Sequence, residues 1–91
     1  MEFKVLIVDD EKDICFLISE LLKDEDYITT TANNSNEALK EFSIFKPDLI
    51  ILDVWLGNSE LDGIELLNEF KKIDPFIPII IVNTHTVLFS E

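Results

Sequence analysis

The 91-residue sequence contains a single cysteine, Cys15, and few positive charges, with seven lysines and arginines against nineteen aspartates and glutamates. One thiol cannot form a disulfide within the chain, which predicts a reduced, cytoplasmic setting. The formal net charge of −12 argues against direct binding to nucleic acid or to an anionic membrane, since both require a basic face. It favours a soluble protein that handles cations or meets a basic partner.

Long apolar runs are missing as well. No uninterrupted apolar stretch is long enough to span a bilayer. A signal peptide is not predicted either, because Glu2 and Lys4 precede an apolar run that Asp9 interrupts. The length and the absence of linkers or repeats predict one domain over residues 1–91, and a hydrophobic content of 47% is sufficient for a packed core.

Four segments have the composition of β-strands. Residues 4–8 and 48–53 are apolar without alternation, which is typical of parallel strands buried on both faces. Residues 27–31 are β-branched but more polar, which indicates a strand at a sheet edge. Residues 77–82 predict another buried strand, with Pro78 near its start, where a missing N–H is tolerated.

Helical periodicity fills the intervals between these strands. A first helix is expected from about Lys12 to Asp24, with an apolar stripe of Ile14, Leu17, Ile18, Leu21 and Leu22. A second is predicted to begin with Ser35 as its N-cap and to end before Pro47. A third starts near Gly63 and turns Ile64, Leu67 and Phe70 inward. The alternation of strands and helices predicts an α/β fold with a doubly wound parallel sheet.

Carboxylates follow two of the predicted strands directly. Asp9 and Asp10 end the first apolar run, and Asp53 ends the run at residues 49–52. In doubly wound sheets, ligands bind beyond the carboxyl ends of the strands. If the first and third strands are adjacent, the three side chains converge on a site suited to Mg²⁺, with Asp53 as a candidate nucleophile. The simpler interpretation is that Asp9 and Asp10 only cap the next helix, as Asp62 is expected to do before Gly63.

Three motifs in these positions resemble the receiver domain of bacterial response regulators. They are Val-Leu-Ile-Val-Asp9-Asp10-Glu11, Leu-Ile-Ile-Leu-Asp53, and Asp62-Gly63 before the third helix. The similarity extends from residue 3 to about residue 85 and implies a flavodoxin-like fold. The segment from Asp53 to Gly63 is most similar to the NtrX type, whose loop is two residues longer than usual and lacks the usual proline.

The resemblance implies a role in two-component phosphorelay signalling. Asp53 would accept a phosphoryl group from a sensor histidine kinase, so the protein would be a phosphoprotein rather than an enzyme. Asp10 would bind Mg²⁺ directly, Asp9 largely through water, and the backbone carbonyl of Trp55 would complete the protein ligands. Another receiver or a full-length response regulator is the further partner that the resemblance suggests.

The sequence also departs from the family's pattern. Receivers carry a serine or threonine at the end of the fourth strand to contact the phosphoryl group, whereas Asn83 stands there, with Thr84 one place later. The family continues with a fourth helix, a fifth strand with a lysine, and a fifth helix, and this sequence ends before them. We therefore expect a sheet shortened to about four strands and three helices, an unpaired apolar edge at residues 77–82, and an atypical tail at residues 84–91.

Three alternative hypotheses remain. A degenerate receiver would bind a kinase or a full-length regulator without switching, as the Asn83 substitution and the missing lysine suggest. A Mg²⁺-dependent phosphatase similar to the haloacid dehalogenases would need a second aspartate where Trp55 stands, which disfavours it. A truncated or frame-shifted reading frame would explain the abrupt change at Thr84 and would predict a poorly stable product.

Overall fold

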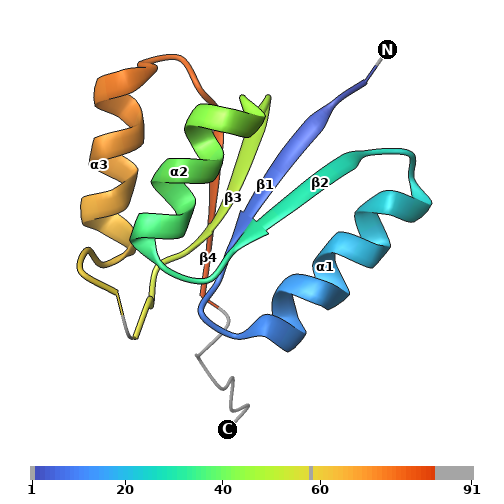
Figure 1. Ribbon diagram of the computed structural model, residues 1–91, viewed down its shortest axis with the longest axis horizontal. Helices are drawn as coiled ribbons and strands as arrows, with labels where there is room; N and C mark the ends of the chain where they lie inside the picture. Colours follow the sequence, from blue (N-terminus) through green and yellow to red (C-terminus); the bar gives the residue numbers. More distant parts are fainter. Residues whose placement is uncertain (1, 58, 84–91) are drawn as a thin grey trace, which may run out of the picture.

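The computed structural model describes residues 2–57 and 59–83, which form a four-stranded parallel sheet with three helices. The strands are β1 (Lys4–Val8), β2 (Ile28–Ala32), β3 (Leu49–Asp53) and β4 (Ile79–Val82), and the helices are α1 (Lys12–Asp24), α2 (Ser35–Phe45) and α3 (Gly63–Ile73). Helix α1 covers one face of the sheet, and α2 and α3 cover the other (Figure 1). The predicted doubly wound α/β fold is confirmed. In this part of the chain, no helix has both the length and the apolar character needed to cross a bilayer.

The strand order β2-β1-β3-β4 places β1 beside β3, as the convergence of the acidic residues requires. Val8 pairs with Ala32 of β2 on one side and with Leu52 of β3 on the other. The chain reverses its direction of travel across the sheet between β1 and β3, because β2 lies outside β1 and β4 outside β3. The carboxyl ends of β1 and β3 therefore form the crevice in which doubly wound proteins bind ligands.

The larger part of the core lies between the sheet and helices α2 and α3. There the Phe42 and Phe70 rings stack at a tilt of 40° with their centroids 4.9 Å apart. Leu66 and Phe70 are fully buried, whereas Ile64 is 48% exposed, so the predicted inward position of Ile64 is wrong. At Gly63, helix α3 lies directly against the backbone that follows β3. The helix residues that face the core are therefore Gly63, Leu66 and Phe70, and Ile64 lies to one side of them.

Helix α1 contacts the sheet through a stripe that differs by one position from the predicted one. Its buried residues are Cys15 and Ser19, and Ile18 and Leu22 pack beside them. The predicted core residues Leu17 and Leu21 are 55% and 59% exposed. The small Cys15 and Ser19 side chains let the helix lie close to β1 and β2, and the Ser19 hydroxyl hydrogen-bonds that of Thr29 at 2.6 Å. The spacing of apolar residues does not reveal this helix face, because Ser19 contacts the sheet through a hydrogen bond.

Strand β4 is not the buried strand that its apolar composition predicts. Ile80 and Ile81 are about half exposed. Within the described residues β4 pairs with β3 alone, so one edge and part of both faces of β4 lack a covering element. The prediction of an apolar edge at this side of the sheet is confirmed for residues 79–82.

Side-chain caps fix the starts of α2 and α3. The Asn34 side chain accepts the Glu37 N–H at 2.9 Å, so Asn34 is the N-cap and Ser35, the predicted cap, is the first helical residue. Asp62 caps α3 and forms a reciprocal capping box with Glu65, as its helix-start interpretation predicts. Moving the α2 cap to Asn34 leaves the Ser35 hydroxyl available for a different contact.

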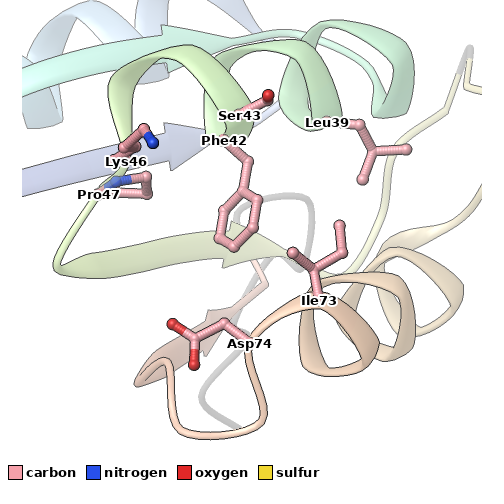
Figure 2. Close-up of a pocket in the computed structure, with 7 residues that line it drawn as sticks. All are labelled: Leu39, Phe42, Ser43, Lys46, Pro47, Ile73 and Asp74. Atoms are coloured by element: carbon pink, nitrogen blue, oxygen red, sulfur yellow. The ribbon is translucent and has the colours of Figure 1, made fainter.

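Helix α2 ends in the left-handed conformation at Lys46, whose φ is 53°. Lys46 borders a groove of about 490 Å³ between α2 and α3 (Figure 2). Because Lys46 and Pro47 shortly precede β3, which ends at Asp53, the groove lies at the other end of this strand. The groove is lined by Leu39, Phe42, Ser43, Lys46, Pro47, Ile73 and Asp74. A side chain at positive φ is strained, and glycine is the residue that relieves this strain at a helix C-terminus.

We expect Lys46→Gly to raise the free energy of unfolding by about 0.5–1 kcal/mol, because the strain it removes exceeds the added backbone entropy of the unfolded chain. Lys40→Gly, a matched change at an exposed position inside α2, should lower it by about 1 kcal/mol. Urea denaturation of both variants measures the difference. Destabilisation by Lys46→Gly equal to that by Lys40→Gly would contradict the assignment of strain to Lys46.

Candidate functional site

Three carboxylates meet at the carboxyl ends of β1 and β3. Asp9, Asp10 and Asp53 each place one oxygen so that the three atoms lie within 4.8 Å of one another. Asp9 and Asp53 are 1% and 0% exposed, and Asp10 is half-buried. The adjacency of β1 and β3, on which the predicted convergence depended, brings these residues together.

Backbone N–H groups hold each of these carboxylates. The Glu11 N–H donates to Asp9 Oδ1 at 2.9 Å, and the Trp55 N–H donates to Asp53 Oδ1 at 3.1 Å. The Gly57 N–H reaches from the loop after β3 to Asp10 Oδ2 at 3.1 Å. These bonds stabilise the anions and fix their directions, but three negative charges so close together still repel one another. A cluster of carboxylate oxygens of this kind fits a hard divalent cation such as Mg²⁺.

Gly63 allows α3 to begin directly against the backbone of Asp53. A Cβ at Gly63 would lie 2.5 Å from Val54 Cα and 2.6 Å from the Asp53 carbonyl oxygen. The Gly63 N–H donates to the Val54 carbonyl at 3.2 Å and closes the loop between β3 and α3. Gly57 is different, since its Cβ would meet only the end of the Asp10 side chain, at 3.0 Å.

The remaining predicted site residues lie at the same edge or outside the described part of the chain. Trp55 is 60% exposed, and its backbone enters the site through the hydrogen bond to Asp53. Asn83 follows β4 directly, next to the pair formed by Asp53 and Val82, so it lies at the same end of the sheet. Thr84 lies outside the described residues. The metal-binding role of the Trp55 carbonyl and the switch roles of Asn83 and Thr84 stay predictions.

Asn33 of the turn between β2 and α2, and Ser35, the first residue of α2, make contacts around the site that the sequence pattern does not reveal. Asn33 Nδ2 donates to the Asp9 carbonyl at 2.9 Å. The buried Ser35 hydroxyl accepts the Leu61 N–H at 3.2 Å, while the Ser35 N–H donates to Ser59 Oγ at 2.6 Å. The segment Asn33-Asn34-Ser35 predicts a turn and a cap, but nothing local points to partners 24 or 26 residues away.

Cys15 lies beneath the acidic cluster. Its thiol is buried and lies 3.4 Å from the Asp9 carbonyl and 3.5 Å from Asn33 Nδ2. Burial, reinforced by the nearby Asp9 charge, raises the pKa of the Cys15 thiol from 9.0 to about 11. A buried thiol with a raised pKa is unreactive.

Because of this pKa shift, the free energy of unfolding should depend on pH in the alkaline range. The folded protein holds the Cys15 proton more tightly than the unfolded chain, so its contribution is complete below pH 9 and is lost as the pH rises towards 11. The loss should amount to about 2–3 kcal/mol. Urea denaturation of wild type and Cys15→Ser at pH 8 and pH 11, without divalent cations, isolates the thiol, because the other groups titrate in both. Equal pH dependence in the two proteins would contradict the shift.

Comparisons with known proteins agree with this geometry. A model of the response regulator receiver domain matches residues 5–90. Over 85 residues the chain is 44% identical to the nitrogen assimilation regulatory protein NtrX of Azorhizobium caulinodans. That match covers 93% of this chain and 19% of the relative, so the chain spans about a fifth of the length of NtrX.

Solved structures show the same fold. The receiver domain of NtrX from Brucella abortus superposes with a TM-score of 0.82 at 43% identity, covering 85% of this chain and 64% of that one. A structure of the histidine kinase ThkA in complex with the response regulator protein TrrA matches with a TM-score of 0.81 at 35% identity, covering 98% and 75%. With its motifs, strand order and acidic cluster, the chain belongs to the response regulator receiver domain family of two-component systems.

Proposed function

We propose that residues 1–91 act as a receiver module in which Asp53 accepts a phosphoryl group from a sensor histidine kinase in the presence of Mg²⁺. The observation that carries the proposal is the meeting of Asp9, Asp10 and Asp53 at the crevice between β1 and β3. The complex of ThkA with TrrA supports a kinase as the donor, since that response regulator shares this fold.

The three carboxylates have different tasks in this proposal. Asp10, the most accessible, and Asp9 would hold the metal ion together with Asp53 and the Trp55 carbonyl. When bound, Mg²⁺ supplies the positive charge that offsets repulsion among the carboxylates and the incoming phosphoryl oxygens. The N–H groups of Glu11, Trp55 and Gly57 keep the carboxylates in fixed directions, which reduces the reorganisation needed at the moment of transfer.

In the proposed transfer, an Asp53 carboxylate oxygen attacks the phosphorus atom of the donor. The new P–O bond makes an acyl phosphate, and the bond from phosphorus to the donor's leaving group breaks, so that group departs with the electron pair and takes a proton from water. Because Asp53 is fully buried, neighbouring residues must move aside before a donor reaches it. Trp55, whose N–H contacts Asp53 and whose side chain is exposed, would report this movement by its fluorescence.

Incubation with acetyl phosphate, with and without Mg²⁺, tests the proposal. We expect one phosphoryl group per chain, detected by intact mass, only when Mg²⁺ is present. Cleavage by hydroxylamine should identify it as an acyl phosphate, and peptide mapping should place it at Asp53. A folded protein that gains no mass from acetyl phosphate or from a phosphorylated kinase would overturn the proposal.

Asn83 favours a second candidate, a module that binds a kinase or another response regulator without switching. An amide follows β4 where the family carries a hydroxyl, and it lies beside the acceptor strand. Under this alternative, an immobilised kinase would capture wild type and Asp53→Ala equally well, and phosphorylation would not change the capture. A change of affinity on phosphorylation would exclude it.

A further inference from the structure

The end of β2 and the turn that follows it fix the backbone of Asp9, one of the three residues of the acidic cluster. The Asp9 N–H donates to the Ala32 carbonyl at 3.0 Å, and Asn33 Nδ2 donates to the Asp9 carbonyl at 2.9 Å. Asn33 is itself fixed, because its N–H donates to the Glu37 carboxylate at 2.8 Å. The peptide groups on both sides of Asp9 are therefore attached to β2 and to the turn after it, which sets the position of the Asp9–Asp10 pair.

The first residue of α2, directly after this turn, holds the loop between β3 and α3. Ser35 is 1% exposed and makes two hydrogen bonds to this loop, one from its N–H to Ser59 Oγ and one from the Leu61 N–H to its own hydroxyl. Earlier in this loop, Trp55 and Gly57 donate their N–H groups to Asp53 and Asp10. Leu56 between them is buried in the core, so this part of the loop is held from both sides.

We infer that Asn33 and Ser35 are positioning residues, through which the β2–α2 turn sets the Asp9–Asp10 pair and the loop of Trp55 and Gly57 at the separation that binds Mg²⁺. Asn33 and Ser35 act on the backbone that carries the carboxylates, Asn33 through the Asp9 carbonyl and Ser35 through the Leu61 N–H. Partners of this kind commonly change metal affinity by tenfold or more when they are removed. The inference rests on the proposed function, since it describes how that same site is held.

Three variants remove these contacts: Asn33→Ala, Ser35→Ala and Ser59→Ala. The Asn33→Ala change removes the bonds of Nδ2 to the Asp9 carbonyl and to Cys15 Sγ, and each serine change removes one bond. Ser43→Ala is the matched control, because Ser43 is an exposed serine of the same helix, eight residues after Ser35. Mg²⁺ titrations followed by Trp55 fluorescence, and acetyl phosphate reactions at a series of Mg²⁺ concentrations, give the half-saturating Mg²⁺ for each protein. We expect an increase of roughly tenfold in the three variants and no change in Ser43→Ala.

Two further readouts separate positioning from general loss of structure. The phosphorylation rate at saturating Mg²⁺ should stay within about twofold of wild type, because the acceptor itself is unchanged. Amide hydrogen exchange at Gly57 should become faster in Ser35→Ala, although Gly57 does not contact Ser35. The Ser35→Ala and Ser59→Ala effects on half-saturation should combine less than additively if the two serines act as one unit.

The outcomes distinguish this inference from the proposed function. Equal half-saturating Mg²⁺ in wild type and in every variant that folds would overturn the positioning role while leaving the phosphoacceptor role intact. So would equal losses in the three variants and in Ser43→Ala. A wild-type protein without any Mg²⁺ response would overturn the proposed function first. Ser59 and Asn33 are half-buried, whereas Ser35 is 1% exposed, so at least the Ser59→Ala and Asn33→Ala variants should fold if Ser35→Ala does not.

Discussion

Asp53→Asn should abolish phosphorylation by acetyl phosphate and at the same time make the metal-free protein more stable. The amide is a poor nucleophile, so no acyl phosphate forms. The substitution also removes one of three negative charges within 4.8 Å of one another, and the asparagine oxygen can still accept the Trp55 N–H. In EDTA we expect the free energy of unfolding to rise by about 1–2 kcal/mol.

With saturating Mg²⁺, wild type should be more stable than Asp53→Asn. Wild type should gain stability if the ion binds only the folded state, about 2.7 kcal/mol at a hundredfold excess over the dissociation constant, and Asp53→Asn should gain less. Thermal melts of both proteins in EDTA and in Mg²⁺ test this crossover. Asp48→Asn is a suitable control, because Asp48 is an exposed aspartate at the opposite end of β3. Destabilisation of Asp53→Asn in EDTA would show that Asp53 is already compensated without a metal.

Gly63→Ala should be among the most destabilising single substitutions in the chain, although it adds only one methyl group. The new Cβ would lie 2.5 Å from Val54 Cα, 2.6 Å from the Asp53 carbonyl oxygen and 2.7 Å from the Val54 carbonyl oxygen. All three are backbone atoms, so relief requires the start of α3 to move away from β3. We expect a loss of about 3 kcal/mol or more in the free energy of unfolding.

Gly57→Ala is the matched comparison within the same loop. Its Cβ would meet only Asp10 Oδ2, at 3.0 Å, and that side chain can turn away. Gly57→Ala should therefore change stability by less than about 1 kcal/mol while raising the Mg²⁺ concentration needed for half-saturation. Urea denaturation gives the stability of both variants, and Trp55 fluorescence gives the Mg²⁺ response. Similar stability losses in the two variants would show that α3 can shift at Gly63 without difficulty.

The contacts around Asp53 and Gly63 show what the receiver motifs require of this fold. Asp9 and Asp10 must follow the buried strand β1, Asp53 must end the neighbouring strand β3, and Gly63 must let a helix begin against the Asp53 backbone. The loop between β3 and α3 is held in place by the hydrogen bonds that Ser59 and Leu61 make with Ser35.

Local sequence determined the elements of this protein. The strand ranges around Val5 and Ile50, the helix starting near Gly63 and the capping role of Asp62 follow from apolar patterns and cap chemistry that act over a few residues. The acidic motifs likewise indicated which carboxylates to examine. Where apolar periodicity failed, as for Leu17 in α1, small residues allowed a close contact that the pattern does not encode.

Only the tertiary structure decided how the site is assembled. The meeting of Asp53 with Asp9 depends on β1 lying next to β3, and strand order is a property of the whole sheet rather than of any one strand. The hydrogen bonds of Asn33 to Asp9 and of Ser35 to Leu61 join positions more than twenty residues apart. No local pattern records such partners, because the chain brings them together only when the helices pack on the sheet.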